Sequence, residues 1–488
     1  MTIRRSLVLT FVERNISLLI FFATTLVVSR ILAPQEFGLF AMALGVVGIA
    51  QALREAGVGI FLVQAETLDQ AMLRAAFTVA LILSFGCAAL LAGIAPLAAD
   101  FFKEPAVREL IFVMAAGFLP VAISASVSGT LQRAMRFRSL FVINLSASTV
   151  YAVMALTLVI GGAGVMGLAW AMTASAFVHA LVCLPFAGGA SRFVPGFEGI
   201  GRIVRYSGAA SVSIILHEVS ERSFNLIVGR ILGAAALGLY FRAHAMVGLF
   251  GRVLDSVHPV LLPAFAQLKR KGDDVSGNLL KGVSLLSGLS LAVYGFFSLV
   301  GEPALVFLYG SQWGEAGVLV APLCLALSVG FSIDRLAIPT YIAFGRIDLT
   351  ILPQLLLTPF KAVVIFLGAQ HSLLAATWSL VSVTAVACLI HIILLSRVVP
   401  VSTSALARRI AHSVLMVLPA LAVGAVAREL ADTLNANAFL TLLSVGVLFT
   451  IVWTGMIWWS KHPLAEEAVS LLRRDPRSSP AYKEPYNV

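Results

Sequence analysis

The sequence Ser29-Arg30-Ile31-Leu32, followed after five residues by Gly38-Leu39-Phe40, decides how the chain is organised. It returns 200 positions later as Gly229-Arg230-Ile231-Leu232, followed after five residues by Gly238-Leu239-Tyr240. Each copy ends one apolar segment, makes a short turn and starts the next segment. Self-similarity at an offset of almost half the chain indicates duplicated halves and not a solenoid of short repeats. The same register pairs further positions, namely Gly48 with Gly248 and Glu55 with Asp255.

The composition places the chain among membrane proteins. Its 488 residues are 59% hydrophobic and only 12% charged, whereas a soluble domain has about 25% charged residues. The net charge of +10 comes from basic residues in short loops between apolar runs, so it indicates membrane topology and no nucleic-acid partner. The cysteines lie inside apolar segments without metal-ligand spacing and are expected to be buried thiols: Cys87, Cys183, Cys324 and Cys388.

Long apolar runs predict an all-α polytopic membrane protein. A helix needs about 20 apolar residues to cross the hydrocarbon core, and continuous rather than alternating hydrophobicity favours helices over a barrel. The first run carries Glu13 and Arg14 and no cleavage site, so it is interpreted as a retained span. The fourteen predicted spans are 7–32, 37–63, 75–99, 106–131, 140–162, 165–187, 207–232, 236–263, 279–300, 315–345, 349–368, 372–396, 410–427 and 438–459.

Basic residues predict the orientation of these spans. Most loop arginines and lysines fall on the side of the N-terminus, and the opposite side has only Arg30, Lys103, Arg108, Arg230 and Arg428. By the positive-inside rule, both termini are expected in the cytoplasm.

The longest interior break between spans, residues 188–206, divides the chain. Its apolar residues alternate with Gly, Arg and Glu, which predicts a linker along the cytoplasmic membrane surface. The predicted domains are an N-terminal lobe (1–187), this linker, a C-terminal lobe (207–396), two further spans (397–460) and a cytoplasmic tail (461–488).

Charged residues inside the spans are the candidate functional residues. A charge at the bilayer centre costs about 2.5–3.5 kcal/mol even on the insertion scale, so these side chains should face a cavity or each other. The basic ones are Arg14, Arg54, Arg222, Arg242, Arg252, Arg335 and Lys361. Acidic residues near them are Glu13, Glu55, Glu221, Asp255 and Asp334. His391 stands alone on an apolar span and is expected to be a buried, hydrogen-bonded histidine.

The first two spans of each half carry most of these charges. Glu218, Glu221, Arg222 and Asn225 recur at i, i+3, i+4 and i+7 and so share one helical face. The second span has a stripe of small residues that ends at Glu55 and predicts close helix packing: Gly38, Ala41, Gly45, Gly48 and Ala52. In a duplicated transporter, these faces would line a central cavity.

The sequence gives little support to enzymatic chemistry. His217 and Glu221 have metal-ligand spacing, but the second histidine of a metalloprotease motif is absent. The chain has neither a GxxxxGK phosphate-binding loop nor a plausible catalytic triad, so no cofactor and no catalytic residue are predicted.

The opening of the chain resembles Wzx-type oligosaccharide flippases. The resemblance lies in Val28-Ser29-Arg30-Ile31-Leu32-Ala33-Pro34-Gln35-Glu36-Phe37-Gly38-Leu39-Phe40 and in Leu53-Arg54-Glu55-Ala56-Gly57-Val58-Gly59. More narrowly, these residues resemble the branch of the family that is associated with exported polysaccharides such as colanic acid and succinoglycan. The implied superfamily, which also contains multidrug antiporters and the lipid II flippase, has two six-helix lobes in a V. Two C-terminal helices would complete the fold here.

The resemblance implies movement of a polyprenyl-pyrophosphate-linked oligosaccharide from the cytoplasmic to the outer leaflet of a bacterial inner membrane. Expected partners are this lipid, membrane lipids, and polysaccharide polymerase and export proteins. The anionic headgroup should meet the cavity cations Arg14, Arg54, Arg222, Arg252 and Lys361. The acidic residues Glu13, Glu55, Glu218, Glu221 and Asp255 would hold these cations or exchange a coupling H+ or Na+.

Two other functions remain open from the sequence. An ion-coupled antiporter of small cationic molecules would use the same fold, and it predicts an excess of acidic residues in the cavity. A membrane-embedded polysaccharide polymerase would need a large outer loop or a catalytic constellation, and the sequence has neither.

Overall fold

The computed structural model describes residues 3–55, 58–65, 68–189, 193–254, 258–272, 274–346 and 348–473. These residues form helices and connecting turns, with no strand among them. Two compact units are present. Unit 1 comprises Met1–Ala243, Leu308–Ala316 and Gln354–Ser379, and unit 2 comprises His244–Phe307, Gly317–Pro353 and Leu380–Val488. The lobes and linker expected from the sequence stay a prediction.

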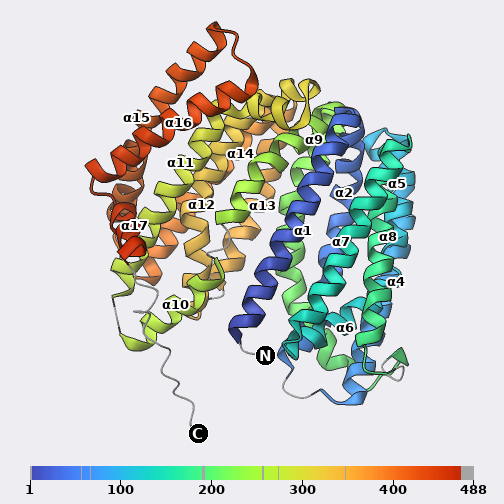
Figure 1. Ribbon diagram of the computed structural model, residues 1–488. Helices are drawn as coiled ribbons and strands as arrows, with labels where there is room; N and C mark the ends of the chain where they lie inside the picture. Colours follow the sequence, from blue (N-terminus) through green and yellow to red (C-terminus); the bar gives the residue numbers. More distant parts are fainter. Residues whose placement is uncertain are drawn as a thin grey trace. The chain divides into compact units, whose positions relative to one another are not determined.

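The first half of the chain forms helices α1–α8. Their bounds are α1 Ile3–Ile31, α2 Pro34–Glu55, α3 Val58–Gln64, α4 Gln70–Phe102, α5 Pro105–Ala116, α6 Val121–Arg133, α7 Phe137–Ile160 and α8 Met166–Cys183, followed by η1 Leu184–Phe186. Within unit 1, α1 packs along α7, and α7 along α8 (Figure 1). Helices α5 and α6 meet at a bend of 51°. The predicted span 106–131 is therefore a broken one, because Gly117 and Pro120 lie at the junction.

The second half begins with the long helix α9. The bounds are α9 Ile200–Leu254, α10 His258–Lys271, α11 Val275–Tyr309, η4 Ser311–Leu319, α12 Val320–Ala343, α13 Asp348–Ala369, α14 Leu373–Val398, α15 Thr403–Thr433, α16 Ala438–Trp459 and α17 Pro463–Arg473. Gly233 interrupts α9 with φ 82° and ψ −177°. A positive φ is readily available only to glycine, and this break falls at the predicted turn between the spans 207–232 and 236–263.

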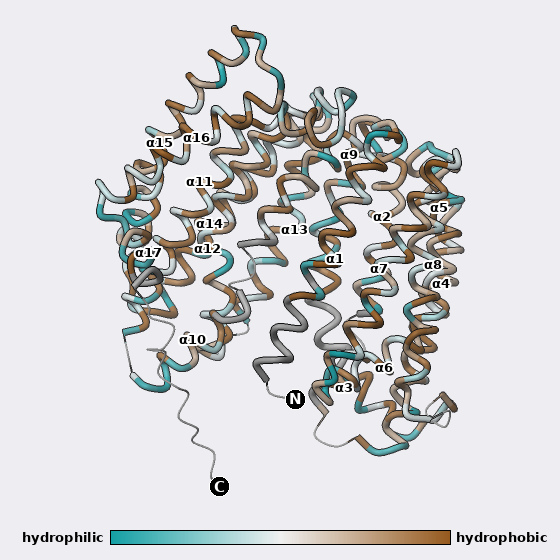
Figure 2. Tube along the Cα trace, in the orientation of Figure 1, coloured by the Kyte–Doolittle hydropathy of each residue, from teal (hydrophilic) through white to brown (hydrophobic). Residues whose placement is uncertain are grey.

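Most helices are apolar along their length, with hydrophilic residues toward the ends and connections (Figure 2). Among the described residues, eleven helices are long and apolar enough to cross a membrane, or twelve if the bent pair α5–α6 forms one span. Fourteen spans therefore stay a prediction. Two differences contribute to the lower number. The apolar part of α1, Asn15–Ile31, is too short to be among the eleven, and the two predicted spans 207–232 and 236–263 correspond to one long candidate, Ile214–Gly251.

The segment Leu308–Ala316 belongs to unit 1 and is bound to the first copy of the repeated turn. The indole Nε1 of Trp313 donates a hydrogen bond to the carbonyl oxygen of Ser29 over 2.8 Å. Gln312 Nε2 donates to the same oxygen over 2.6 Å, and Arg30 Nε donates to the carbonyl oxygen of Leu308 over 3.3 Å. Arg30 thus has a packing role, as expected for the end of a span.

Arg242 lies inside this part of unit 1 with 2% of its surface exposed. Its guanidinium carbon is 4.0 Å from the ring centroid of Phe37, 4.9 Å from that of Tyr309 and 5.3 Å from that of Trp313. A guanidinium is weakly hydrated and attracted to aromatic faces, so such a cage can hold it away from water. Arg242 thereby joins α2, α9 and the segment Leu308–Ala316.

The residues 193–206 of the predicted linker pack on unit 1. Thr78 Oγ1 of α4 donates to the carbonyl oxygen of Gly196 over 2.8 Å and accepts from the Gly196 amide over 2.9 Å. Ile203 is fully buried in a cluster with α3 and α4, whereas Phe197 is 75% exposed. Ile203 therefore attaches this segment to α3 and α4, whereas Val194, Phe197 and Val204 leave apolar surface exposed.

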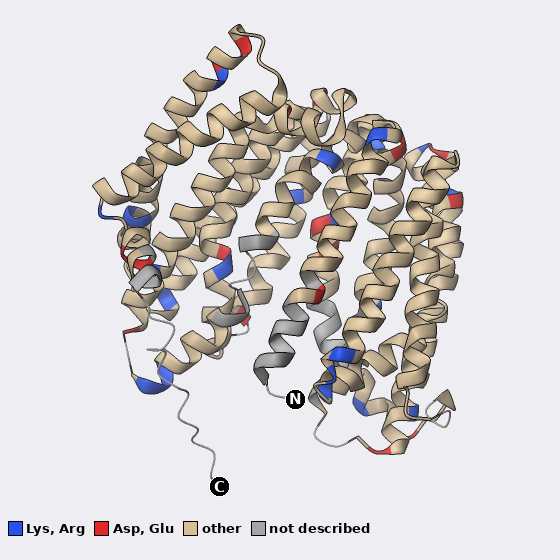
Figure 3. Ribbon diagram, viewed as in Figure 1, with Lys and Arg blue, Asp and Glu red and all other residues tan. Residues whose placement is uncertain are grey.

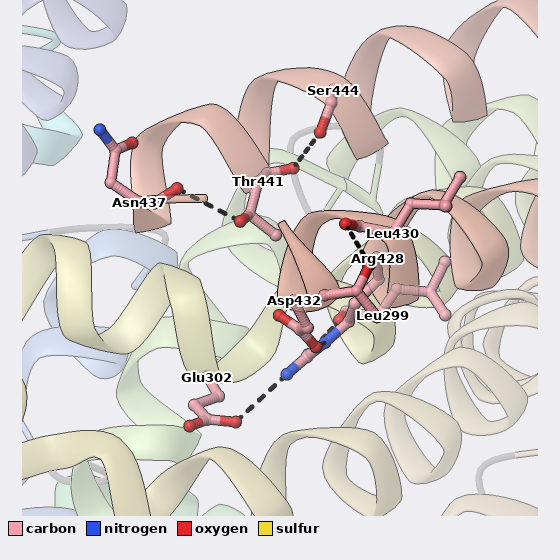
Figure 4. Close-up of polar contacts among 9 residues, drawn as sticks. Leu299, Glu302, Arg428, Leu430, Asp432, Asn437, Thr441 and Ser444 are labelled. Atoms are coloured by element: carbon pink, nitrogen blue, oxygen red, sulfur yellow. Dashed lines mark hydrogen bonds and ion pairs between the residues drawn. The ribbon is translucent and has the colours of Figure 1, made fainter. Parts of the chain in front are cut away.

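Polar contacts connect the helices of unit 2. Arg428 of α15 lies 3.2 Å from Glu302 of α11 and 3.5 Å from Asp432 one turn further along its own helix, and it also donates to the carbonyl oxygen of Leu299 (Figure 4). Ser413 of α15 lies 2.7 Å from Ser287 of α11. These contacts attach α15 to α11 at two levels, at Ser413 in its first half and at Arg428 near its C-terminal end.

Candidate functional site

Charged residues gather mostly near helix ends, and a smaller number lie along the middle of helices (Figure 3). The polar face of α9 that the sequence predicts carries two ion pairs, and both belong to the charged residues along the middle of helices. Arg222 Nε donates to Glu218 Oε1 over 2.6 Å, and Lys361 Nζ of α13 donates to Glu221 Oε1 over 3.1 Å. Only 30% of the Arg222 side chain and 15% of the Lys361 side chain are exposed. These two cations are therefore each compensated by a carboxylate, which offsets the cost of their desolvation.

The small residues of α2 pack against α9 and make room for this pair. A Cβ added at Gly48 would lie 2.7 Å from Arg222 Nε, and one at Gly45 would lie 3.3 Å from the side chain of Leu226. The stripe of small residues on α2 therefore permits close approach to α9, which confirms the predicted close packing of this helix.

A cavity of about 410 Å³ with mixed polar and apolar lining lies within unit 1. Its wall includes Arg54 of α2, six residues after Gly48. Helices α1, α2, α3, α6, α7 and α8 contribute to its wall. The lining residues are Glu13, Arg54, Gly59, Val121, Ser124, Ala125, Ser128, Gly129, Gln132, Phe137, Leu140, Asn144 and His179.

Contacts between neighbouring helices position the polar side chains of this cavity. His179 Nε2 of α8 lies 3.3 Å from Asn144 Oδ1 of α7, and His179 Nδ1 lies 4.0 Å from Cys183 Sγ. Cys183 Sγ is also 4.0 Å from Ser128 Oγ of α6. The guanidinium of Arg54 lies over the ring of Phe118, 5.4 Å from its centroid. The wall of the cavity is therefore tied together across several helices.

The predicted site residues fall into three groups. Glu13 and Arg54 line the cavity, and Arg222, Glu218, Lys361 and Glu221 form the two ion pairs. The side chains of Arg14, Glu55 and Arg252 lie outside the described part of the structure, although their backbone is helical. Asp255 lies outside the described residues altogether.

The neutral polar residues of the cavity were not among the predicted site residues. They are Ser124, Ser128, Gln132, Asn144 and His179. A signal was present, because Asn144 and His179 are strongly polar residues inside apolar spans. Because they carry no formal charge, the pattern of charged residues in the spans does not include them.

Unit 2 contains a separate buried polar cluster. Tyr341 Oη lies 3.2 Å from His391 Nδ1, and His391 Nε2 lies 3.9 Å from Asp334 Oδ1. His391 is therefore hydrogen-bonded and buried, as predicted, and it lies near the acidic residue of the pair Asp334–Arg335.

The apolar helices and the charged side chains held among them define a multi-pass membrane protein. The family described as polysaccharide biosynthesis protein matches residues 27–317. This match spans more than half of the chain, so the protein belongs to that family, which confirms the resemblance of its opening residues.

Two curated relatives are similar in sequence. The succinoglycan biosynthesis transport protein ExoT of Rhizobium meliloti (strain 1021) is 28% identical over 315 residues, 63% of each chain. The lipopolysaccharide biosynthesis protein WzxC of Escherichia coli (strain K12) is 22% identical over 334 residues, 66% of each chain. Each match spans slightly less than two thirds of the relative's length.

Two solved structures share the fold. The lipid II flippase MurJ, in an inward closed conformation, matches 96% of this chain and 99% of its own with a TM-score of 0.71 at 10% identity. An inward-facing multidrug resistance MATE family transporter of the MOP superfamily matches 83% of this chain and 99% of its own, with a TM-score of 0.65 at 16% identity. The all-helical MurJ- and MATE-like fold predicted from the sequence is thereby confirmed.

Proposed function

We propose that this protein is a flippase that moves polyprenyl-pyrophosphate-linked oligosaccharide units from the cytoplasmic to the outer leaflet of the bacterial inner membrane, for exopolysaccharide synthesis. The family, the succinoglycan transport relative and the MurJ-like fold support this activity. The positive-inside pattern supports cytoplasmic termini. The cycle would be alternating access around a cationic cavity, as in other transporters with repeated halves.

The observation that carries the proposal is the set of basic residues held inside unit 1. Arg222 and Lys361 are oriented by carboxylates, and Arg54 lies on the cavity wall. Glu218 engages Arg222 through Nε, and the terminal nitrogens of a guanidinium are the donors that bind phosphate oxygens in a bidentate manner. A pyrophosphate would exchange part of its hydration for these donors while the lipid chain stays among apolar helices.

Leaflet translocation in proteoliposomes tests the proposal. The lipid-linked oligosaccharide is placed in the inner leaflet, and a membrane-impermeant lectin measures how fast its sugar reaches the outside. Wild-type protein should accelerate this exposure. Arg54→Gln should slow it about 10- to 100-fold, the range expected for losing a hydrogen bond to a charged group.

Matched variants separate substrate contact from charge balance. The double variant Glu218→Gln with Arg222→Gln removes both members of the ion pair and should also slow translocation. Arg108→Gln removes an exposed arginine that lies over Phe112, and it should translocate at the wild-type rate. If the protein takes up a cationic dye in response to an ion gradient and does not expose the lipid-linked sugar, the flippase proposal is wrong and the protein is a small-molecule antiporter.

A further inference from the structure

The lining of the cavity in unit 1 contains more neutral hydrogen-bonding side chains than charged ones. Five of its side chains are neutral and hydrogen-bonding, namely Ser124, Ser128, Gln132, Asn144 and His179. Hydroxyl and amide side chains can both donate and accept, as can a neutral imidazole through its two nitrogens. Among the side chains that the structure describes, one guanidinium, Arg54, and one carboxylate, Glu13, accompany them in the lining.

This balance does not suit an inorganic ion. A pyrophosphate requires several cationic donors, and the described lining supplies one, Arg54, so this cavity alone does not make a complete pyrophosphate site. A bound metal ion would require a cluster of strong ligands, and no group of three His, Cys, Asp or Glu side chains gathers in the described part of the chain. The lining therefore favours a neutral ligand with many hydrogen-bonding groups.

Size and apolar surface narrow the ligand further. The cavity volume of about 410 Å³ falls within the range of about 300–1,000 Å³ that is typical of small-molecule sites. Val121, Phe137 and Leu140 supply apolar surface beside the polar groups. A sugar ring has hydroxyl groups that donate and accept at its rim and C–H groups on its faces, so it matches both kinds of surface.

Arg54 is both a lining residue of this cavity and one of the proposed contacts of the pyrophosphate headgroup. It lies on α2, six residues after Gly48, which contacts Arg222. Six residues of α-helix span about 9 Å along the axis. Phosphate near Arg54 would thus leave the sugars next to the neutral part of the lining.

We infer that this cavity binds the first sugars of the lipid-linked oligosaccharide, next to the pyrophosphate, and that Asn144, Gln132 and His179 recognise their hydroxyl groups. This inference rests on the proposed flippase function and assigns a carbohydrate subsite to unit 1 alone. The hydrogen bond between His179 and Asn144 holds both side chains at the wall before a ligand arrives.

Binding measurements with and without sugar test the subsite. Full-length protein in lipid nanodiscs is titrated with polyprenyl pyrophosphate that carries no sugar, and with the same lipid carrying the oligosaccharide. Wild-type protein should bind the glycosylated lipid more tightly. Asn144→Leu and Gln132→Leu should each reduce this preference about two- to tenfold, the range expected for one neutral hydrogen bond.

Thr149→Val is the matched control on α7, because the Thr149 hydroxyl donates only to its own helix at Leu145 and the residue is exposed. It should keep the wild-type preference, and thermal unfolding in detergent checks that every variant is folded. An equal affinity of wild-type protein for both lipids, or an unchanged preference in both Leu variants, overturns the sugar subsite while the flippase proposal stands. If neither lipid binds to wild-type protein, the flippase proposal is overturned together with the subsite.

Discussion

Gly38 lies directly against the main-chain carbonyl of Ala234, and a Cβ added at Gly38 would overlap this carbonyl oxygen. Gly238 has the reciprocal relationship, since its Cβ would overlap the carbonyl oxygen of Pro34. Position 38 corresponds to 238, and position 34 to 234, in the 200-residue repeat. The two copies of the repeated turn therefore meet through equivalent residues, and each requires a glycine where the backbone of the other passes.

This contact predicts that Gly38→Ala destabilises the protein. The neighbouring atoms belong to backbone, which cannot rotate away as a side chain does, so α2 and α9 must separate. We expect a lower midpoint of thermal unfolding in detergent. Gly93→Ala is the control, because nothing lies within 4 Å of its Cβ position and alanine is about 1 kcal/mol better than glycine in a helix. Equal midpoints for the two variants would contradict the close approach at Gly38.

The aromatic cage around Arg242 gives a second prediction. Arg242→Lys keeps the charge but replaces the planar guanidinium by a strongly hydrated ammonium group. We expect destabilisation of about 2 kcal/mol, the magnitude of a desolvated cation–π contact, measured by thermal unfolding. Arg230→Lys, at an exposed guanidinium 5.6 Å from the ring centroid of Phe101, should change the midpoint much less. If both lysine variants unfold at the wild-type temperature, the cage does not contribute to stability.

The ion pair between Lys361 and Glu221 gives a third prediction. Lys361→Glu places two carboxylates together and should lower the unfolding midpoint and the translocation rate. The exchanged double variant, Lys361→Glu with Glu221→Lys, should recover much of the midpoint. Because 53% of the Glu221 side chain is exposed, the coupling energy should be about 1 kcal/mol.

The control for this cycle is the exposed pair Arg346–Asp348, whose side chains are 51% and 57% exposed. The same exchange there should leave the midpoint unchanged. An exchanged Lys361–Glu221 variant no more stable than Lys361→Glu alone would show that the two residues do not interact.

The sequence was sufficient for the pattern of helices because its signals are local. Apolar runs predicted the spans, and the repeat predicted the turn at which Gly233 breaks α9. The bend between α5 and α6 was not predicted, although Pro120 favours it, because the hydropathy of the two helices is continuous. The position of this turn thus depends on neighbouring residues in the sequence, whereas the count of fourteen spans stays a prediction beside the eleven or twelve among the described residues.

The candidate site could be predicted only in part, because it depends on contacts between distant residues. The spacing of Glu218 and Arg222 was enough to predict their shared face. The partner of Glu221, by contrast, lies 140 residues away at Lys361. The cavity was missed because its side chains come from six helices and most of them are neutral.

A last prediction concerns the pH dependence of stability through His462, which lies between α16 and α17. Burial, together with the nearby positive charges of His412 and Arg409, lowers the pKa of His462 from its ordinary value near 6.5 to about 4. Its Nδ1 accepts a hydrogen bond from the Leu464 amide over 3.3 Å, and its Nε2 lies 3.2 Å from Ser413 Oγ. Protonation at Nδ1 would remove the first bond and place a charge where none of the imidazole is exposed.

The sign of the effect follows from the two pKa values. Above pH 6.5 both folded and unfolded chains carry neutral His462, so its contribution is complete. As the pH falls from 6.5 to 4, the unfolded chain binds a proton that the folded protein does not, and stability decreases; below pH 4 the change levels off. Thermal unfolding in detergent should therefore show a midpoint that falls across this range in wild-type protein, and less steeply in His462→Asn. The exposed His371 is the control, since His371→Asn should keep the wild-type slope. A His462→Asn protein whose midpoint falls as steeply as that of the wild type would exclude His462 as the cause.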